Sequence, residues 1–182
     1  MNSDFQIVDS LQKEQTISLE DFRFLLETQD NELIEYLAAY ARKTTTAIYD
    51  NHIYIRGLIE FTNICKNDCF YCGIRKSNTN AQRYRLTKDD ILACCKTGYA
   101  LGFRTFVLQG GEDAYFTDTL VCDIVSSIKK QHSDCAITLS IGEKTRDSYQ
   151  KYFDAGTDRY LLRHETANEA HYQSLHPSEL SF

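Results

Sequence analysis

From residue 52 onward, short β-rich runs alternate with amphipathic helical segments, and this alternation limits the possible folds more than any other feature of the chain. We predict strands at 53–61, 103–108, 136–141 and 159–162. The predicted helices between and after them lie at 87–102, around 120–128, at 144–156 and at 167–173. Connections of this length between successive strands form right-handed βαβ units, so the sequence predicts an α/β fold with a parallel sheet.

Two architectures fit this alternation. A complete eight-fold βα barrel needs about 250 residues, so four units within residues 52–182 correspond to half of one. The alternative is a small, open, doubly wound sheet with helices on both faces. The periodicity of the apolar residues is compatible with both.

The first 50 residues are predicted to be helical. Ser18 is a suitable N-cap, with Asp21 three residues later, for a helix that contains Phe22 and Leu25. A second helix is predicted from about Asn31, because apolar residues recur there at helical spacing: Leu33, Ile34, Leu37, Tyr40 and Ala41. We therefore expect a helical extension at 1–50 and the βα region at 51–182.

Charge and hydropathy argue against two classes of partner. The net charge is −6 and there is no run of Lys and Arg, so neither a nucleic-acid surface nor a polybasic membrane contact is expected. No apolar stretch approaches the roughly 20 residues that a membrane helix needs. The start, MNSDFQIVDS, lacks the basic flank and apolar centre of a signal peptide. We expect a cytoplasmic protein.

The chain has seven cysteines, and disulfides do not explain them, because the cytosol keeps thiols reduced. Three lie within eight residues: Cys65, Cys69 and Cys72. The other four are scattered over predicted helices and a strand edge, where cysteine serves as a small, mostly core residue: Cys94, Cys95, Cys122 and Cys135.

The three clustered cysteines have the spacing C-x3-C-x2-C. Iron–sulfur clusters are usually held by four cysteine thiolates. Three close thiolates can hold three irons of a 4Fe-4S cube and leave the fourth iron open, and an open position is where a metal site does chemistry. A structural zinc site with a histidine such as His52 is an alternative, but the usual second cysteine pair is missing. Three incidental core cysteines are a poorer interpretation, because the segment NICKND is polar.

Polar and glycine residues follow the other predicted strands. Gly110 and Gly111 let the backbone approach a ligand closely, although such a pair more often marks a turn. Arg163 can hold a carboxylate and Glu165 can accept ribose hydroxyl groups, unless the two simply pair in a solvated loop. Ser140 is a lesser candidate at the end of the third strand.

With aromatic Tyr71 before the third cysteine, the motif resembles the C-x3-C-x-φ-C signature of the radical S-adenosylmethionine (SAM) superfamily. This resemblance implies that the open iron binds the amino and carboxylate groups of SAM. An electron from the cluster then cleaves the sulfonium to methionine and a 5′-deoxyadenosyl radical. The Gly-Gly-Glu that follows the second strand resembles the superfamily motif that holds the SAM amino group.

A closer resemblance rests on five segments, IEFTNICKNDCFYCGIR, RYRLT, VLQGGEDAY, TLSIGE and DRYLLRHETAN. Together they resemble the HydE family of FeFe-hydrogenase maturases, of which DRYLLRHETAN is the most specific part. The families of methylornithine synthase and biotin synthase are the near alternatives. A metal-binding module without catalysis is the alternative from another class.

The HydE resemblance implies a radical SAM TIM-type barrel that helps to build the hydrogenase di-iron centre. Its implied substrate is an iron carbonyl–cyanide precursor carrying cysteine, supplied by a partner maturase, and its implied electron donor is a ferredoxin or flavodoxin. The cluster ligands would be Cys65, Cys69 and Cys72, and Arg163 would face the substrate. The implied SAM site comprises Tyr71, Gln109, Gly110, Gly111, Glu112, Ser140 and Glu165.

Members of that family contain a whole barrel, which needs about 250 residues. We therefore expect a truncated gene, a fragment or a partial record, without strands five to eight and without the second cluster of some members. A half barrel would expose sheet edges and apolar strand surface. On this basis the chain alone is expected to associate along its edges and not to turn over SAM.

Overall fold

The computed structural model describes residues 3–182, and the chain divides into two compact units, Met1–Tyr54 and Ile55–Phe182. The first unit contains α1 (Ser3–Glu14), α2 (Leu19–Glu27) and α3 (Asn31–Tyr49). Ser18 caps α2 as predicted, and its side chain accepts a hydrogen bond from the backbone of Asp21. Between α1 and α3, Val8 and Leu33 are buried, and the hydroxyl groups of Tyr36 and Tyr40 donate to Asp9.

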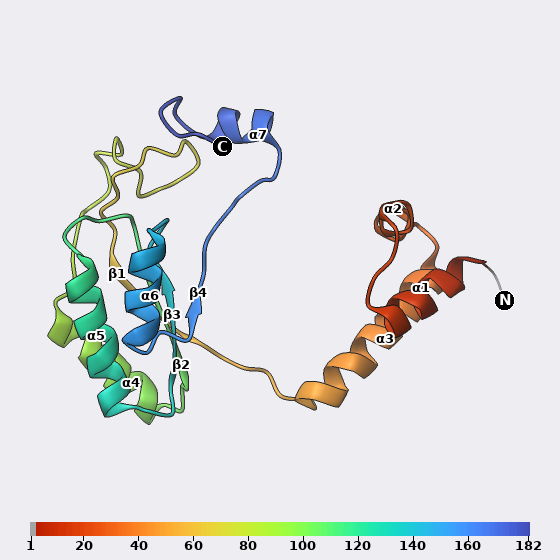
Figure 1. Ribbon diagram of the computed structural model, residues 1–182, viewed down its shortest axis with the longest axis horizontal. Helices are drawn as coiled ribbons and strands as arrows, with labels where there is room; N and C mark the ends of the chain where they lie inside the picture. Colours follow the sequence, from red (N-terminus) through yellow and green to blue (C-terminus); the bar gives the residue numbers. More distant parts are fainter. Residues whose placement is uncertain (1–2) are drawn as a thin grey trace. The chain divides into compact units, whose positions relative to one another are not determined.

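The second unit is built on a four-stranded parallel sheet in the order β1-β2-β3-β4. Its strands are β1 (Gly57–Thr62), β2 (Thr105–Gly110), β3 (Ala136–Ser140) and β4 (Arg159–Tyr160). The crossover helices are α4 (Lys88–Ala100), α5 (Asp118–Gln131) and α6 (Arg146–Asp154), and α7 (Glu169–Leu175) follows the last strand (Figure 1).

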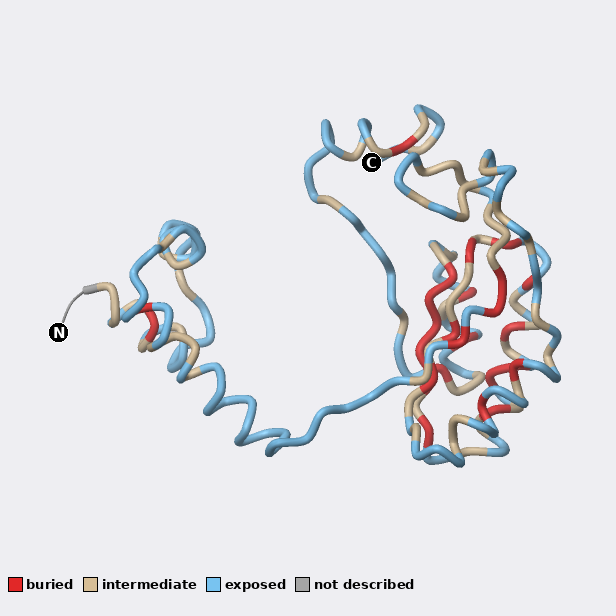
Figure 2. Tube along the Cα trace, turned by 180° about the vertical axis from the view of Figure 1, so that it is seen from behind, coloured by how far each residue is buried: buried red, intermediate tan, exposed pale blue. Residues whose placement is uncertain are grey.

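The arrangement of the helices decides between the two predicted architectures. α4, α5 and α6 pack their buried residues into one apolar cluster with alternate residues of the strands, on a single face of the sheet (Figures 1 and 2). A doubly wound sheet reverses its strand order and carries helices on both faces. Sequential strand order with helices on one face is the arrangement of a βα barrel, so the fold is a partial barrel.

Strand boundaries differ from the predicted ones where pairing is missing. β1 begins at Gly57 instead of 53, and Ile53 is 89% exposed, because residues 53–56 have no neighbouring strand to pair with. β2 runs two residues further than predicted, since Gly110 pairs with Thr62. β4 is reduced to two residues paired only with β3. The apolar residues of a segment do not show which of its backbone N–H and C=O groups form hydrogen bonds with a neighbouring strand, so they do not fix where the strand begins and ends.

The helix ends agree with the sequence signals. Thr87 and Asp90 form a capping box at the start of α4, and Gly102 and Gly156 follow α4 and α6 with φ of 96° and 106°. Cys95 and Cys135 are buried, and burial raises the pKa of the Cys95 thiol to about 12. Cys94 is exposed on α4, so the interpretation of all four scattered cysteines as core residues is wrong for this one. No helix within residues 3–182 is long and apolar enough to cross a membrane.

Asp118 joins the first turn of α5 to α6. It accepts hydrogen bonds from the hydroxyl groups of Tyr152 (2.6 Å) and Ser148 (2.8 Å). The Tyr152 hydrogen bond is the main reason that the pKa of Asp118 lies below its ordinary value. Burial opposes this shift less strongly than Tyr152 favours it, and Ser148 and Lys151 lower the pKa further. A carboxyl whose folded pKa is lowered stabilises the fold above its unfolded pKa, and that contribution is lost as the pH falls through the folded value.

Asp118→Asn is therefore expected to lower the free energy of unfolding by about 1 kcal/mol near neutral pH. The difference from the unaltered chain should shrink as the pH falls below the ordinary aspartate pKa of about 3.9. Urea unfolding at pH 7 and pH 3 measures both values. An equal loss at both pH values would mean that the charge of Asp118 is not what stabilises this contact.

Candidate active site

A cavity of about 580 Å³ lies at the carboxyl ends of the strands, the end at which barrel enzymes carry their sites. Its lining comes from four parts of the chain: the cysteine segment, the glycines after β2, the residues after β3, and the stretch from β4 to the C-terminus. Ten of the eleven predicted site residues line it: Cys65, Cys69, Tyr71, Cys72, Gly110, Gly111, Glu112, Ser140, Arg163 and Glu165.

Gln109 is the predicted site residue that does not line the cavity. Its side-chain amide donates to Glu60 at 3.1 Å. Glu60 and Gln109 are register partners on β1 and β2, and alternation along both strands places them opposite the helix-covered face. Sequence reasoning overlooked Glu60, although a charged residue inside the apolar run GLIEFT was a signal for it.

The backbone at Gly111 packs directly against the cysteine segment. A Cβ atom on Gly111 would lie 2.3 Å from the carbonyl oxygen of Ile64 and 2.8 Å from the Cβ of Cys65. The backbone N–H of Glu112 points at Cys65 Sγ over 3.4 Å, and the N–H of Lys66 donates to the carbonyl of Glu112. Glycine is therefore required here for a close approach of two loops, and not for a turn alone.

Glu112 is held in place from the same segment. Asn67 Nδ2 donates to one of its carboxylate oxygens (2.7 Å) and Lys66 Nζ lies 3.0 Å from the other. On the opposite side, Gly142 has φ of 80°, and a Cβ there would lie 2.2 Å from Glu112 Cγ. Gly142 was not predicted as a site residue, and the Ile-Gly-Glu that follows β3 was the signal for it.

The three cysteines are half-buried free thiols at the cavity wall. Burial is the main reason that the pKa of Cys69 lies above its ordinary value. Within residues 3–182, no three His, Cys, Asp or Glu side chains are close enough to bind one metal ion together. In a 4Fe-4S cube each thiolate binds a different iron, so its three ligands lie further apart than the ligands of one ion. The half-buried thiolates and the N–H aimed at Cys65 Sγ fit such a cluster.

His176, which sequence reasoning overlooked, ties the C-terminal segment to Tyr71. Its side chain is buried, Nδ1 lies 2.9 Å from the carbonyl oxygen of Tyr172, and Nε2 lies 3.2 Å from the hydroxyl of Tyr71. Because a carbonyl only accepts, Nδ1 carries a proton and donates to Tyr172, and Nε2 shares a second hydrogen bond with the hydroxyl of Tyr71. The backbone N–H of Phe70 also donates to the carbonyl of Leu175. No local pattern indicated these long-range contacts.

Arg163 and Glu165 both line the cavity beyond β4. In the part of the chain that the structure describes, no ion pair within 4 Å joins them, so the solvated pair considered as an alternative is not formed. Glu165 has φ of 38°, a left-handed conformation that is uncommon for a residue other than glycine. Such backbone strain is concentrated at functional sites.

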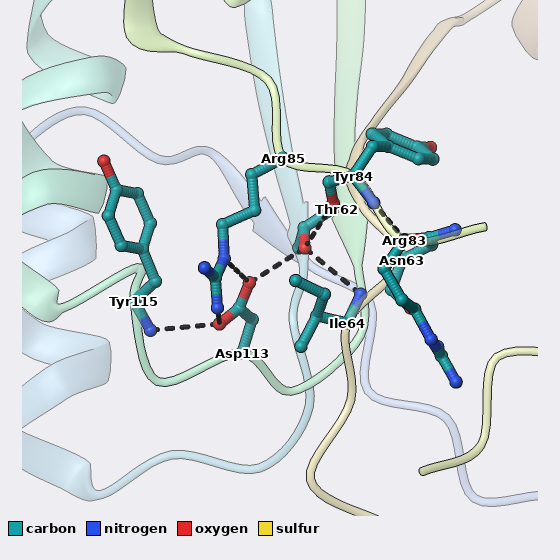
Figure 3. A network of polar contacts seen from close by, with 8 residues as sticks. All are labelled: Thr62, Asn63, Ile64, Arg83, Tyr84, Arg85, Asp113 and Tyr115. Carbon is teal, nitrogen blue, oxygen red and sulfur yellow. Dashed lines mark hydrogen bonds and ion pairs between the residues drawn. The ribbon is translucent and has the colours of Figure 1, made fainter. Parts of the chain in front are cut away.

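A buried carboxylate, that of Asp113, follows Glu112 in the chain and is held by a network of polar contacts (Figure 3). Asp113 receives two hydrogen bonds from Arg85 (2.7 and 2.9 Å), one from the hydroxyl of Thr62 (2.9 Å) and one from the backbone of Tyr115 (3.1 Å). Burial by itself would raise the pKa of Asp113, but these donors outweigh it and the pKa is lowered. Arg85 lies in the segment RYRLT and Asp113 in the segment LQGGED. Nothing in the sequence of either segment predicted that these two side chains form an ion pair.

Comparisons with known proteins identify the family of this chain. The model of the radical SAM superfamily matches residues 59–179. The FeFe-hydrogenase maturase subunit HydE of Thermotoga maritima is 38% identical over 172 residues, which covers 94% of this chain and 49% of that protein. The 3-methylornithine synthase of Methanosarcina acetivorans is 30% identical over 162 residues, covering 87% of this chain and 45% of the relative.

Solved structures agree with the sequence comparison. The FeFe-hydrogenase maturase HydG has a TM-score of 0.86 at 27% identity, covering 98% of this chain and 41% of that structure. Methylornithine synthase has a TM-score of 0.81 at 28% identity, covering 94% of this chain and 51% of that structure. The chain thus spans about half the length of the relatives that it matches. On the family match over residues 59–179, the chain belongs to the radical SAM superfamily.

Proposed function

We propose that the protein is a radical SAM enzyme that holds a 4Fe-4S cluster on Cys65, Cys69 and Cys72, and that its role is FeFe-hydrogenase maturation of the HydE type. In this proposal residues 1–50 are a helical extension and 51–182 form half of the barrel. The observation that carries the proposal is the contact between the Gly-Gly-Glu backbone and the cysteine segment, with the Glu112 N–H directed at Cys65 Sγ.

When bound, such a cluster supplies the electron that cleaves the sulfonium of SAM to methionine and a 5′-deoxyadenosyl radical. The role of this chain is to bind and orient SAM. Glu112, already fixed by Lys66 and Asn67, offers a carboxylate to the SAM amino group. The carbonyl of Gly110 and the hydroxyl of Ser140 are acceptors at the same wall, and Glu165 can accept from ribose hydroxyl groups.

Tyr71 and Arg163 complete the proposed site. Tyr71, held by His176, presents an aromatic ring at the cavity wall, where a nucleobase can pack against it. Arg163 places a guanidinium in the same cavity for an anionic substrate group. Gln109 stays among the proposed SAM contacts. It does not line the cavity, but its side chain lies on the face of the sheet opposite the helices, where its amide donates to Glu60.

The cluster assignment is tested by reconstituting the chain with iron and sulfide under anaerobic conditions. The expected result is a reduced cluster whose EPR spectrum changes when SAM is added, since an open iron can accept SAM as a ligand. A single tightly bound zinc and no such spectrum would support a metal-binding module without catalysis, and would contradict the proposal.

The finer assignment depends on the substrate. The higher identity to HydE, 38% against 30% for 3-methylornithine synthase, favours hydrogenase maturation over an organic substrate. The proposed substrate is an iron carbonyl–cyanide precursor supplied by another maturase, with a ferredoxin or flavodoxin as electron donor. Restored hydrogenase activity in cells that lack their own HydE is the expected result when this region is expressed as part of a complete barrel. Formation of 3-methylornithine, with no such restoration, would favour a methylornithine-synthase type instead.

A further inference from the structure

Arg83 makes an unusual set of contacts with the segment that carries the cysteines. Its guanidinium donates to four backbone carbonyl groups at 2.5 to 3.1 Å: those of Asn63, Ile74, Arg75 and Asn78. Figure 3 shows the side chain extending away from Asp113, on the other side of the segment from Arg85. The two nearby arginines therefore have separate partners.

The four carbonyls come from both ends of one loop. Asn63 precedes the first cysteine, and the other three residues follow the third. One rigid planar group thus joins the two ends of the loop. It holds these ends together and so restricts the conformation of the segment that contains Cys65, Cys69 and Cys72. A guanidinium has five N–H donors in a fixed fork, whereas a lysine ammonium has three donors at a single point.

A second pair of hydrogen bonds joins Asn63 to the segment that carries Arg83. The side-chain amide of Asn63 donates to the carbonyl of Gln82 (2.7 Å), and its oxygen accepts from the backbone of Tyr84 (2.8 Å; Figure 3). Within residues 3–182, no ion pair closer than 4 Å includes Arg83. Arg83 thus binds backbone carbonyl groups of the loop and not the carboxylate of an acidic side chain.

We propose that Arg83 is a positioning residue that sets the spacing of the three thiolates for the cluster. This inference rests on the proposed function, because it assumes that the loop holds a cluster. Groups that orient metal ligands without touching the metal typically change metal affinity roughly 10–100-fold when they are replaced. A positioning role therefore predicts a change at the cluster that exceeds any change in the folding of the sheet.

The test compares the reconstituted 182-residue chain with Arg83→Lys, which keeps the charge and loses the fork. We expect iron release to a chelator to be roughly 10–100-fold faster in this variant, together with an altered EPR spectrum of the reduced cluster. Lys76→Gln is the matched control, because it removes a positive charge from an exposed position of the same loop. It should release iron at the unaltered rate.

The outcomes separate the two proposals. If the unaltered chain assembles no cluster, the proposed function fails, and this inference fails with it. If the unaltered chain assembles a cluster and Arg83→Lys matches it in iron release and EPR spectrum, only the role of Arg83 is refuted. If Arg83→Lys does not fold, the proposal is also overturned, because a positioning role predicts a larger change at the cluster than in the folding of the sheet.

Discussion

Replacing any one of Cys65, Cys69 and Cys72 with serine is expected to abolish assembly of the cluster. Iron bound after anaerobic reconstitution should fall from about four atoms per chain to the level of a chain without a site. The physical reason is that a cube held by three thiolates has no spare protein ligand, and a serine hydroxyl is a poor substitute for a thiolate toward iron. Iron and sulfide analysis together with EPR spectroscopy measures the loss.

The matched control is Cys94→Ser, since Cys94 is exposed on α4 and does not line the cavity. This variant should bind as much iron as the unaltered chain and give the same EPR change with SAM. Full cluster content in the Cys69→Ser variant would rule out the assignment of the three thiolates as ligands. Equal losses in all four serine variants would show that the cysteines act through folding and not through the cluster.

The second large effect is expected at Gly111. In Gly111→Ala the new methyl group would lie 2.3 Å from the carbonyl oxygen of Ile64, which belongs to the backbone and has no other rotamer to adopt. The loop after β2 must then separate from the cysteine segment, and the contact from the Glu112 N–H to Cys65 Sγ is lost. Overpacking of this kind costs about 2 kcal/mol of unfolding free energy. We also expect the EPR response to SAM to disappear.

Gly73→Ala is the control for this substitution. Gly73 lies directly after Cys72, and a Cβ at that position would have no atom within 4 Å. Urea unfolding and the SAM-dependent EPR change should therefore match those of the unaltered chain within error. A Gly111→Ala chain with unaltered stability and SAM response would show that the close approach of the two loops is not required.

Two glycines, Gly111 and Gly142, allow neighbouring loops of this site to pack closely together. Gly111 and Gly142 both face groups that a Cβ would strike, and those groups are Ile64 and the side chain of Glu112. Both contacts join loops that follow different strands. The carboxyl ends of parallel strands bring such loops together, which is why a barrel assembles its site from residues far apart in the sequence.

The sequence by itself determined the features that depend on neighbouring residues. The alternation of strands and helices and the cap at Ser18 are confirmed, because each is set within a few residues of the chain. The sequence left the barrel and the doubly wound sheet open, because apolar periodicity shows that a strand has a buried face but not which strand lies beside it.

The tertiary structure alone decided the contacts between distant residues. Four such contacts were not predicted from the sequence. They are the hydrogen bonds between Gln109 and Glu60, between His176 and Tyr71, between Arg85 and Asp113, and between Arg83 and both ends of the cysteine loop. These pairs are 5 to 105 residues apart along the chain. The physical reason is that such hydrogen bonds depend on strand register and loop path, which are fixed only when the sheet assembles and buried polar groups must find partners.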